Sequence, residues 1–181
     1  LPKLLGLFPF NEALLLTLQR MTIELEMPAE LDGLKICQLS DLHFTGEVDI
    51  RYFERVVEEA NQFQPDLVVI TGDLVDHAKC IEWIPKTFGK LNAPLGVFYV
   101  LGNHDRRIQS ENFLRKNIHN SGLIQASSRW HEIEHKGATI LSEYGNSDFK
   151  KYYDKMKGKR FWGWRTFTVY KDEELTFIDD T

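Results

Sequence analysis

Cysteine is scarce in this sequence, which contains only Cys37 and Cys80. Two cysteines do not make a disulfide framework and indicate no redox compartment, and we interpret Cys37, which lies in a predicted strand, as a small buried hydrophobe. An excess of positive charge is also lacking. The net charge of −5 argues against general nucleic-acid binding, so no nucleic acid is expected as a partner. Internal repeats and low-complexity segments are absent, and 181 residues predict a single globular domain.

A long apolar run is missing as well. A membrane-spanning helix needs about 20 uninterrupted apolar residues, and the most apolar segment, residues 1–18, is interrupted at Pro2, Pro9, Asn11 and Glu12. This segment fits three interpretations: the end of a signal or anchor, an amphipathic helix on a membrane surface, or a helix docked on the domain itself. The first two predict a peripheral membrane contact through residues 1–18, and the third fits a cytoplasmic protein. Because the chain does not begin with methionine, we expect that an upstream part was removed or not recorded.

Three short apolar segments predict buried strands at residues 34–40, 65–71 and 97–101. Residues 49–64, between the first two, predict a helix because one face is apolar at helical spacing, at Phe53, Val56, Val57, Ala60 and Phe63. Residues 81–91 predict a shorter helix between the second and third strands. Strand, helix and strand of these lengths form a crossover between parallel strands, so the predicted fold class is α/β.

Further elements are predicted on both sides of this core. Residues 21–27 alternate apolar and polar side chains, which is typical of a half-buried strand. Residues 110–119 predict a helix, and residues 123–141 predict strands with a hairpin tip at Lys136 and Gly137.

The C-terminal part has a different character. Residues 150–165 carry seven Lys or Arg and one acid, interleaved with aromatic side chains. We interpret them as a solvated basic helix before two terminal strands at 166–170 and 175–178. The alternative is that the basic and aromatic side chains bind single-stranded nucleic acid or a membrane surface. The predicted divisions are an apolar N-terminal segment at 1–20, a domain at 21–145, and an atypical basic and aromatic tail at 146–181.

Each of the three predicted core strands ends in side chains of the types that commonly bind metal ions. Asp41 and His43 follow the first strand, and two residues apart in extended backbone they would point to the same side and hold one cation. Asp73 follows the second strand and can bridge two cations, while Asn103 and His104 follow the third. Ligands of open α/β sheets bind at this edge of the strands. The oxygen and nitrogen donors suit Mn, Fe or Zn, and two such ions roughly 3.5–4 Å apart can generate a hydroxide and clamp a phosphoryl group.

Each motif alone is more often ordinary turn or helix-cap chemistry. Together, Ser40 to His43, Gly72 to Asp76 and Gly102 to Asp105 resemble the first three motifs of the calcineurin-like metallophosphoesterases, most closely the bacterial branch of small phosphohydrolases. The resemblance covers roughly residues 21–130. It implies a four-layer α/β/β/α sandwich with a dinuclear metal site at the strand ends.

The resemblance also implies roles for single residues. Its metal ligands correspond to Asp41 and His43 on the first ion, Asp73 as the bridge, and Asn103 on the second ion. His104 would be the acid or transition-state stabiliser, oriented by Asp76, so these two residues are the predicted catalytic pair. Asn103 and His104 are also the residues predicted to contact the substrate.

The sequence departs from the family in its later part. The family completes its site with a lone histidine and then a Gly-His-x-His motif, whereas the histidines after His104 here are His119, His131 and His135, without that motif. The sandwich is therefore expected to be incomplete in its C-terminal half, and the second metal site with it. His131 and His135, four residues apart on a strand, would share one face and could in principle bind metal, although two surface histidines are the favoured interpretation.

Two functional hypotheses follow. In the first, the chain is a phosphoesterase that hydrolyses phosphomono- or diesters with a hydroxide activated by two divalent ions, and His131, His135 or a second subunit completes the site. In the second, it is an inactive, truncated remnant that binds one metal or a protein partner.

Overall fold

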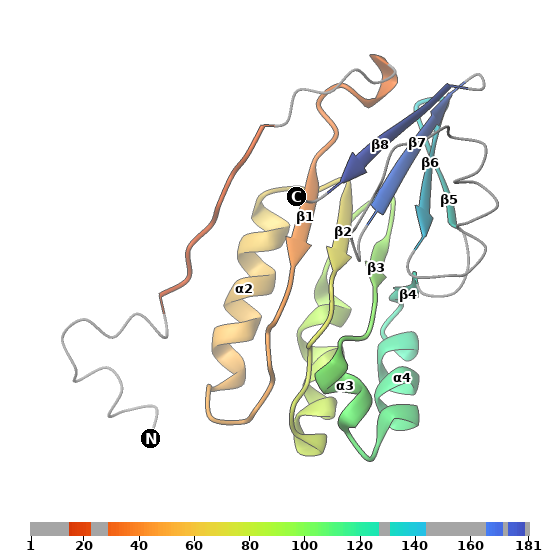
Figure 1. The fold of residues 1–181 in the computed structure, drawn as a ribbon. Helices are drawn as coiled ribbons and strands as arrows, with labels where there is room; N and C mark the ends of the chain where they lie inside the picture. Colours follow the sequence, from red (N-terminus) through yellow and green to blue (C-terminus); the bar gives the residue numbers. More distant parts are fainter. Residues whose placement is uncertain (1–14, 23–28, 127–130, 144–165, 172–173, 180–181) are drawn as a thin grey trace.

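The computed structural model describes residues 15–22, 29–126, 131–143, 166–171 and 174–179 (Figure 1). The order of elements is η1 (Ala29–Leu31), β1 (Ile36–Leu39), α2 (Ile50–Gln62), β2 (Leu67–Ile70), η2 (Ala78–Lys86), η3 (Phe88–Lys90), β3 (Val97–Tyr99), α3 (Asn103–Arg107), α4 (Glu111–Asn120), β4 (Ile124–Gln125), β5 (His131–His135), β6 (Ala138–Glu143), β7 (Thr166–Lys171) and β8 (Glu174–Asp179). The strands form two sheets of four, in the orders β1-β2-β3-β4 and β5-β6-β7-β8.

The first sheet is parallel throughout, which confirms the predicted α/β class. β1 pairs with β2 from Ile36 opposite Leu67 to Leu39 opposite Ile70. All four side chains of β2 are buried, as expected for a central parallel strand covered on both faces. The three predicted core strands are therefore present and neighbour one another.

Helix α2 provides the crossover between β1 and β2. The Asp49 side chain accepts a hydrogen bond from the Arg51 N–H and so caps the N-terminus, where the first N–H groups have no partner within the helix. Its buried residues are the predicted apolar face, Phe53, Val56, Val57 and Ala60. The prediction of a helix over residues 49–64 is thus confirmed.

The helix predicted at residues 81–91 is present as the two 3₁₀ helices η2 and η3. Pro85 lies inside η2. Proline lacks the N–H that an α-helical hydrogen bond needs, and its ring clashes with the carbonyl four residues earlier. The short helix α3 was not predicted, since Asn103 to Arg107 has no apolar periodicity. Helix α4 matches the prediction for residues 110–119.

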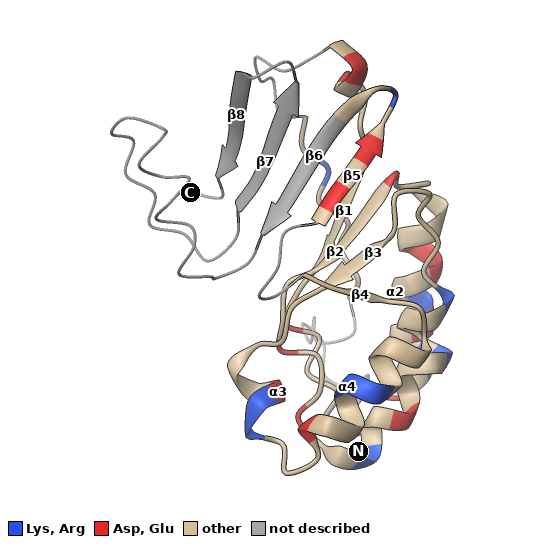
Figure 2. Cartoon of the chain, turned by 90° about the vertical axis from the view of Figure 1, so that its right-hand side faces the viewer, with Lys and Arg blue, Asp and Glu red and all other residues tan. Residues whose placement is uncertain are grey.

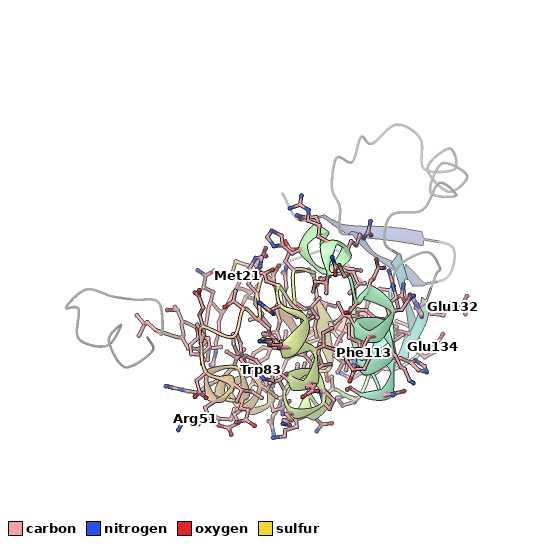
Figure 3. The ribbon with its side chains drawn as sticks, turned by 90° about the horizontal axis from the view of Figure 1, so that it is seen from below. Met21, Arg51, Trp83, Phe113, Glu132 and Glu134 are labelled. Atoms are coloured by element: carbon pink, nitrogen blue, oxygen red, sulfur yellow. The ribbon has the colours of Figure 1, made fainter. Side chains whose placement is uncertain are left out.

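Alternate residues of the central strand face two different cores. Val68 and Ile70 pack into the larger core with residues of α2, η2 and α4, and Leu67 and Val69 pack on the opposite face. Seen from below, α2, η2 and α4 lie along the first sheet, where Arg51, Trp83 and Phe113 mark them (Figure 3). Strand β5 of the second sheet lies on the other side of the first sheet (Figure 2), and its Ile133 packs into the core that contains Leu67 and Val69. The described residues thus form three of the four expected layers, α/β/β, and contain no helix outside the second sheet.

The second sheet is an antiparallel meander. Its first hairpin turns at Lys136 and Gly137, which both have positive φ, and this confirms the predicted tip. The two predicted terminal strands are present as β7 and β8, and β7 pairs with β6. This pairing joins strands on the two sides of the predicted boundary at residue 145. The division into domain and tail stays a prediction. The basic segment at 150–165 lies outside the described residues.

Most of the N-terminal part also lies outside the described residues, which begin at residue 15. The predicted strand at 21–27 falls there too, except for its first two residues, which have no regular secondary structure. In the part of the chain that the structure describes, no helix has the length and apolar character needed to cross a membrane.

Candidate metal centre

The turns after β1 and β2 run side by side at the carboxyl edge of the first sheet. The Asp41 N–H donates to the Gly72 carbonyl at 3.1 Å, and the His43 N–H donates to the Asp73 carbonyl at 2.9 Å. The Phe44 N–H continues this ladder to the Leu74 carbonyl. Both turns are therefore held by the main chain, and they place the side chains of Asp41, His43 and Asp73 at one edge.

The backbone at these three residues is left-handed. Asp41 has φ 53°, His43 has φ 43° and Asp73 has φ 52°. The extended backbone predicted for Asp41 and His43 is therefore wrong, although the predicted convergence of their side chains is present. Left-handed conformations are costly for residues other than glycine and concentrate at functional sites, where the surrounding structure holds them.

Ligand atoms of Asp41, His43 and Asp73 all lie within 4.8 Å of one another. The His43 Nε2 is 3.9 Å from the Asp41 Oδ1. The Asp41 Oδ2 also contacts the Ser40 hydroxyl, a contact that sequence reasoning did not predict. Two carboxylates and an imidazole form a donor set for Mn, Fe or Zn rather than for ions that prefer thiolates, so these residues fit a divalent metal.

Two glycines let the turns after β2 and β3 touch. A Cβ on Gly72 would lie 2.9 Å from the Gly102 Cα, and a Cβ on Gly102 would lie 2.0 Å from the Asp73 Oδ1. The close approach allows the His104 N–H to donate to the Asp73 Oδ1 at 2.9 Å. Asn103 begins α3 at the same edge, next to this contact. The turn after β3 is thus placed against the proposed bridging ligand.

The Asp105 side chain also connects the turns after β2 and β3 by hydrogen bonds. This side chain is fully buried. The Oδ1 accepts from the Leu74 and Val75 N–H groups, and the Oδ2 accepts from the Gly102 N–H, each at 2.9 Å. Burial raises the pKa of Asp105, while these three N–H groups act in the opposite direction. Sequence reasoning gave this residue no role, and its place directly after His104 in the third motif was the signal that could have found it.

Asp76 lies between His43 and His104. Its Oδ1 is 2.9 Å from the His104 Nδ1, the contact that the family resemblance implies, and 3.0 Å from the His43 Nδ1. The hydrogen bond to Asp76 raises the pKa of His43. Burial raises the pKa of Asp76, but the hydrogen bonds and charges of His43 and His104 outweigh it and lower the pKa overall. The contact with His43 was not predicted.

The histidines that were candidates for completing the second site lie on β5. The His131 Nε2 donates to the Gln125 carbonyl at 2.7 Å, and its ring meets Phe98 edge-on. Within the described residues, neither His131 nor His135 belongs to a group of three ligands that could hold a metal. The predicted ligands of a second ion on the described part remain Asp73 and Asn103.

A family model described as calcineurin-like phosphoesterase matches residues 34–177. The chain belongs to the calcineurin-like phosphoesterase family. The resemblance seen in the three motifs is thereby confirmed, and hydrolysis with divalent metals is typical of this family. The match extends through β7 into β8.

Relatives of this chain include two uncharacterized metallophosphoesterases and one named pyrophosphatase. An uncharacterized metallophosphoesterase of Aquifex aeolicus is 36% identical over 117 residues, which are 62% of this chain and 45% of the relative. The UDP-2,3-diacylglucosamine pyrophosphatase LpxG of Chlamydia muridarum is 38% identical over 42% of this chain and 24% of its own length. The uncharacterized metallophosphoesterase YkuE of Bacillus subtilis is 35% identical over 44% of this chain and 29% of its own. The chain thus spans less than half the length of these relatives.

Proposed function

We propose that this chain hydrolyses phosphomono- or diesters at the carboxyl edge of its first sheet. The observation that carries the proposal is the cluster of Asp41, His43 and Asp73, whose ligand atoms lie within 4.8 Å of one another beside the pair of His104 and Asp76. A donor set for a divalent ion next to an imidazole held by a carboxylate is the combination that phosphoester hydrolysis needs.

The proposed metal ligands are Asp41 and His43 for a first ion, Asp73 for both ions and Asn103 for a second. When bound, divalent ions lower the pKa of a water molecule and neutralise the charge of a phosphoryl group. The left-handed turns and the buried Asp105 hold the ligands in place before an ion arrives, so less ordering is needed on binding.

The chain's own contribution to proton transfer would come from His104. Its side chain is 42% exposed, so a substrate can reach it. Because the Asp76 carboxylate only accepts, the His104 Nδ1 keeps its hydrogen toward Asp76. When the ring is protonated at both nitrogens, the Nε2 gives its proton to the leaving oxygen, and the neutral ring that remains keeps its hydrogen on the Nδ1. Asn103 precedes His104 and would contact the same phosphoryl group.

A second candidate is the non-catalytic remnant, which would bind one metal or a protein partner. The absence of His131 and His135 from any three-ligand group in the described residues favours it. Metal stoichiometry separates the two candidates, because two ions per chain support hydrolysis by a dinuclear site and one ion or none supports the remnant.

The test is metal content together with hydrolysis of an aryl phosphate monoester and diester in Mn²⁺. A pyrophosphate is added to the set because LpxG, a relative, is named a pyrophosphatase. We expect two ions per chain and activity that is lost in Asp73→Asn, whereas Asp32→Asn, a matched change at an exposed aspartate, keeps both. One ion or none, with hydrolysis no faster than in Asp73→Asn, would contradict the proposal.

Metal titrations of two variants test the separate roles. Asp73→Asn should lower metal binding more than His104→Ala, because Asp73 is the proposed ligand of both ions and His104 faces the substrate. Isothermal titration calorimetry with Mn²⁺ measures the difference. Equal losses in the two variants would contradict these roles.

A further inference from the structure

One carboxylate reaches two imidazoles in this site. The Asp76 Oδ1 lies 3.0 Å from the His43 Nδ1 and 2.9 Å from the His104 Nδ1, and the Asp76 Oδ2 lies 3.1 Å from the His43 Nδ1. The two rings meet edge-on, with centroids 4.7 Å apart and an angle of 81° between their planes. A carboxylate has enough lone pairs to accept from both rings at once.

This arrangement selects the tautomer of His43. An ionised carboxylate can only accept, so the Nδ1 that faces Asp76 carries the hydrogen and the Nε2 keeps its lone pair. The same Nε2 faces the Asp41 Oδ1 at 3.9 Å, within the cluster that includes Asp73. His43 therefore presents a lone pair where a metal ion would need it, because a histidine that binds a metal donates its other N–H to an outer partner.

We propose that Asp76 is a positioning residue for the metal ligand His43 as well as for His104, so that the first metal site and the proton-carrying imidazole share one anchor. This inference rests on the proposed function, which assigns His43 to the metal. It adds that loss of Asp76 damages metal binding itself and is not confined to proton transfer.

The substitution Asp76→Asn separates these roles. The amide keeps one accepting oxygen but turns an N–H donor toward the second imidazole, so one of the two rings loses its partner or changes tautomer. His104→Ala is the matched comparison, since it removes the other imidazole and leaves the contact between Asp76 and His43 intact.

The first measurement is the tautomer of both histidines in the metal-free chain, read from the imidazole nitrogen shifts in NMR spectra recorded at a pH where those shifts show both rings to be neutral. In the wild-type chain we expect hydrogen on the Nδ1 of His43 and of His104, and in Asp76→Asn a mixture at His43. Hydrogen on the His43 Nε2 in the wild-type chain would overturn the proposal, and this result does not depend on whether the variant folds.

The second measurement is Mn²⁺ affinity by isothermal titration calorimetry, with circular dichroism to confirm folding. We expect Asp76→Asn to bind Mn²⁺ about 10- to 100-fold more weakly at the first site and His104→Ala to match the wild type. Unchanged affinity in Asp76→Asn, or an equal loss in His104→Ala, would overturn the positioning role. No Mn²⁺ binding by the wild-type chain would overturn the proposed function, and the tautomers then decide the role of Asp76 by themselves.

Discussion

At the scale of single residues, the site depends on how closely the turns after β2 and β3 approach each other. Gly102 has φ −77°, a value that any residue adopts, so backbone freedom is not the reason for a glycine here. Space is the reason, because a Cβ would lie 2.0 Å from the Asp73 Oδ1 and 2.4 Å from the Asp73 nitrogen. Gly122 is the opposite case, since it has φ +82° and open space around the position of a Cβ.

Alanine at these two glycines should therefore have different effects. Gly102→Ala should displace the Asp73 carboxylate and lower Mn²⁺ affinity by about tenfold or more, as expected for a disturbed ligand. Gly122→Ala should cost about 1–2 kcal/mol of stability through its left-handed backbone and leave Mn²⁺ affinity unchanged. Calorimetry with Mn²⁺ and urea denaturation measure the two quantities. Unchanged metal binding in Gly102→Ala would contradict the steric explanation.

At the scale of elements, the start of α2 depends on the charge of Asp49. The neighbouring Arg51 lowers the pKa of Asp49 through hydrogen bonds from its side chain and its N–H. A carboxyl group whose pKa is lower in the folded state stabilises the fold above its unfolded pKa, and this contribution is lost as the pH falls through the folded pKa. Asp49→Ala should therefore lower the urea midpoint at about pH 7, and the difference from the wild type should shrink toward about pH 2. A difference that is the same at both pH values would contradict the charge-dependent cap.

The turn after β1 is also held by packing against the helices. Phe44, which follows His43, is fully buried. The centroid of its ring lies 4.4 Å from the ring centroid of Phe53 on α2, 5.1 Å from that of Phe88 on η3 and 5.7 Å from that of Trp83 on η2. Phe44→Ala should cost about 3–5 kcal/mol because it leaves a cavity among these rings. The exposed Phe113→Ala on α4 should cost less than about 0.5 kcal/mol. Urea denaturation compares them, and similar costs would show that these rings do not hold the turn.

At the scale of the whole molecule, the two sheets share a core. Ile133 of β5 is buried with Leu67 and Val69 of β2 and Phe98 of β3. If this core makes the sheets one cooperative unit, Ile133→Ala should lower the stability of the whole chain by about 2–5 kcal/mol in a single transition. Far-ultraviolet circular dichroism and Mn²⁺ binding during urea denaturation should then change together. Loss of part of the dichroism at a urea concentration that leaves Mn²⁺ binding intact would show that the sheets unfold separately.

Much of the fold was predictable from the sequence because its signals are local. The three apolar segments predicted as strands form β1, β2 and β3, and the segment 49–64 with its apolar face forms α2. The hairpin turns at Lys136 and Gly137 as predicted. Local signals did not give every detail. The helix predicted at residues 81–91 is of the 3₁₀ type, with Pro85 inside it, and α3 was missed because it has no apolar periodicity.

The sequence by itself determined the α/β class, the family motifs and the side chains that lie at the strand ends. These features depend on the order of short segments and on residues that are close together in the chain. Only the tertiary structure decided the left-handed turns, the three contacts of the buried Asp105 and the double contact of Asp76. The physical reason is separation along the chain: Asp76 is 33 residues from His43 and 28 from His104, and Asp105 is 31 from Leu74. Such contacts exist only once parallel strands have brought their carboxyl ends to one edge.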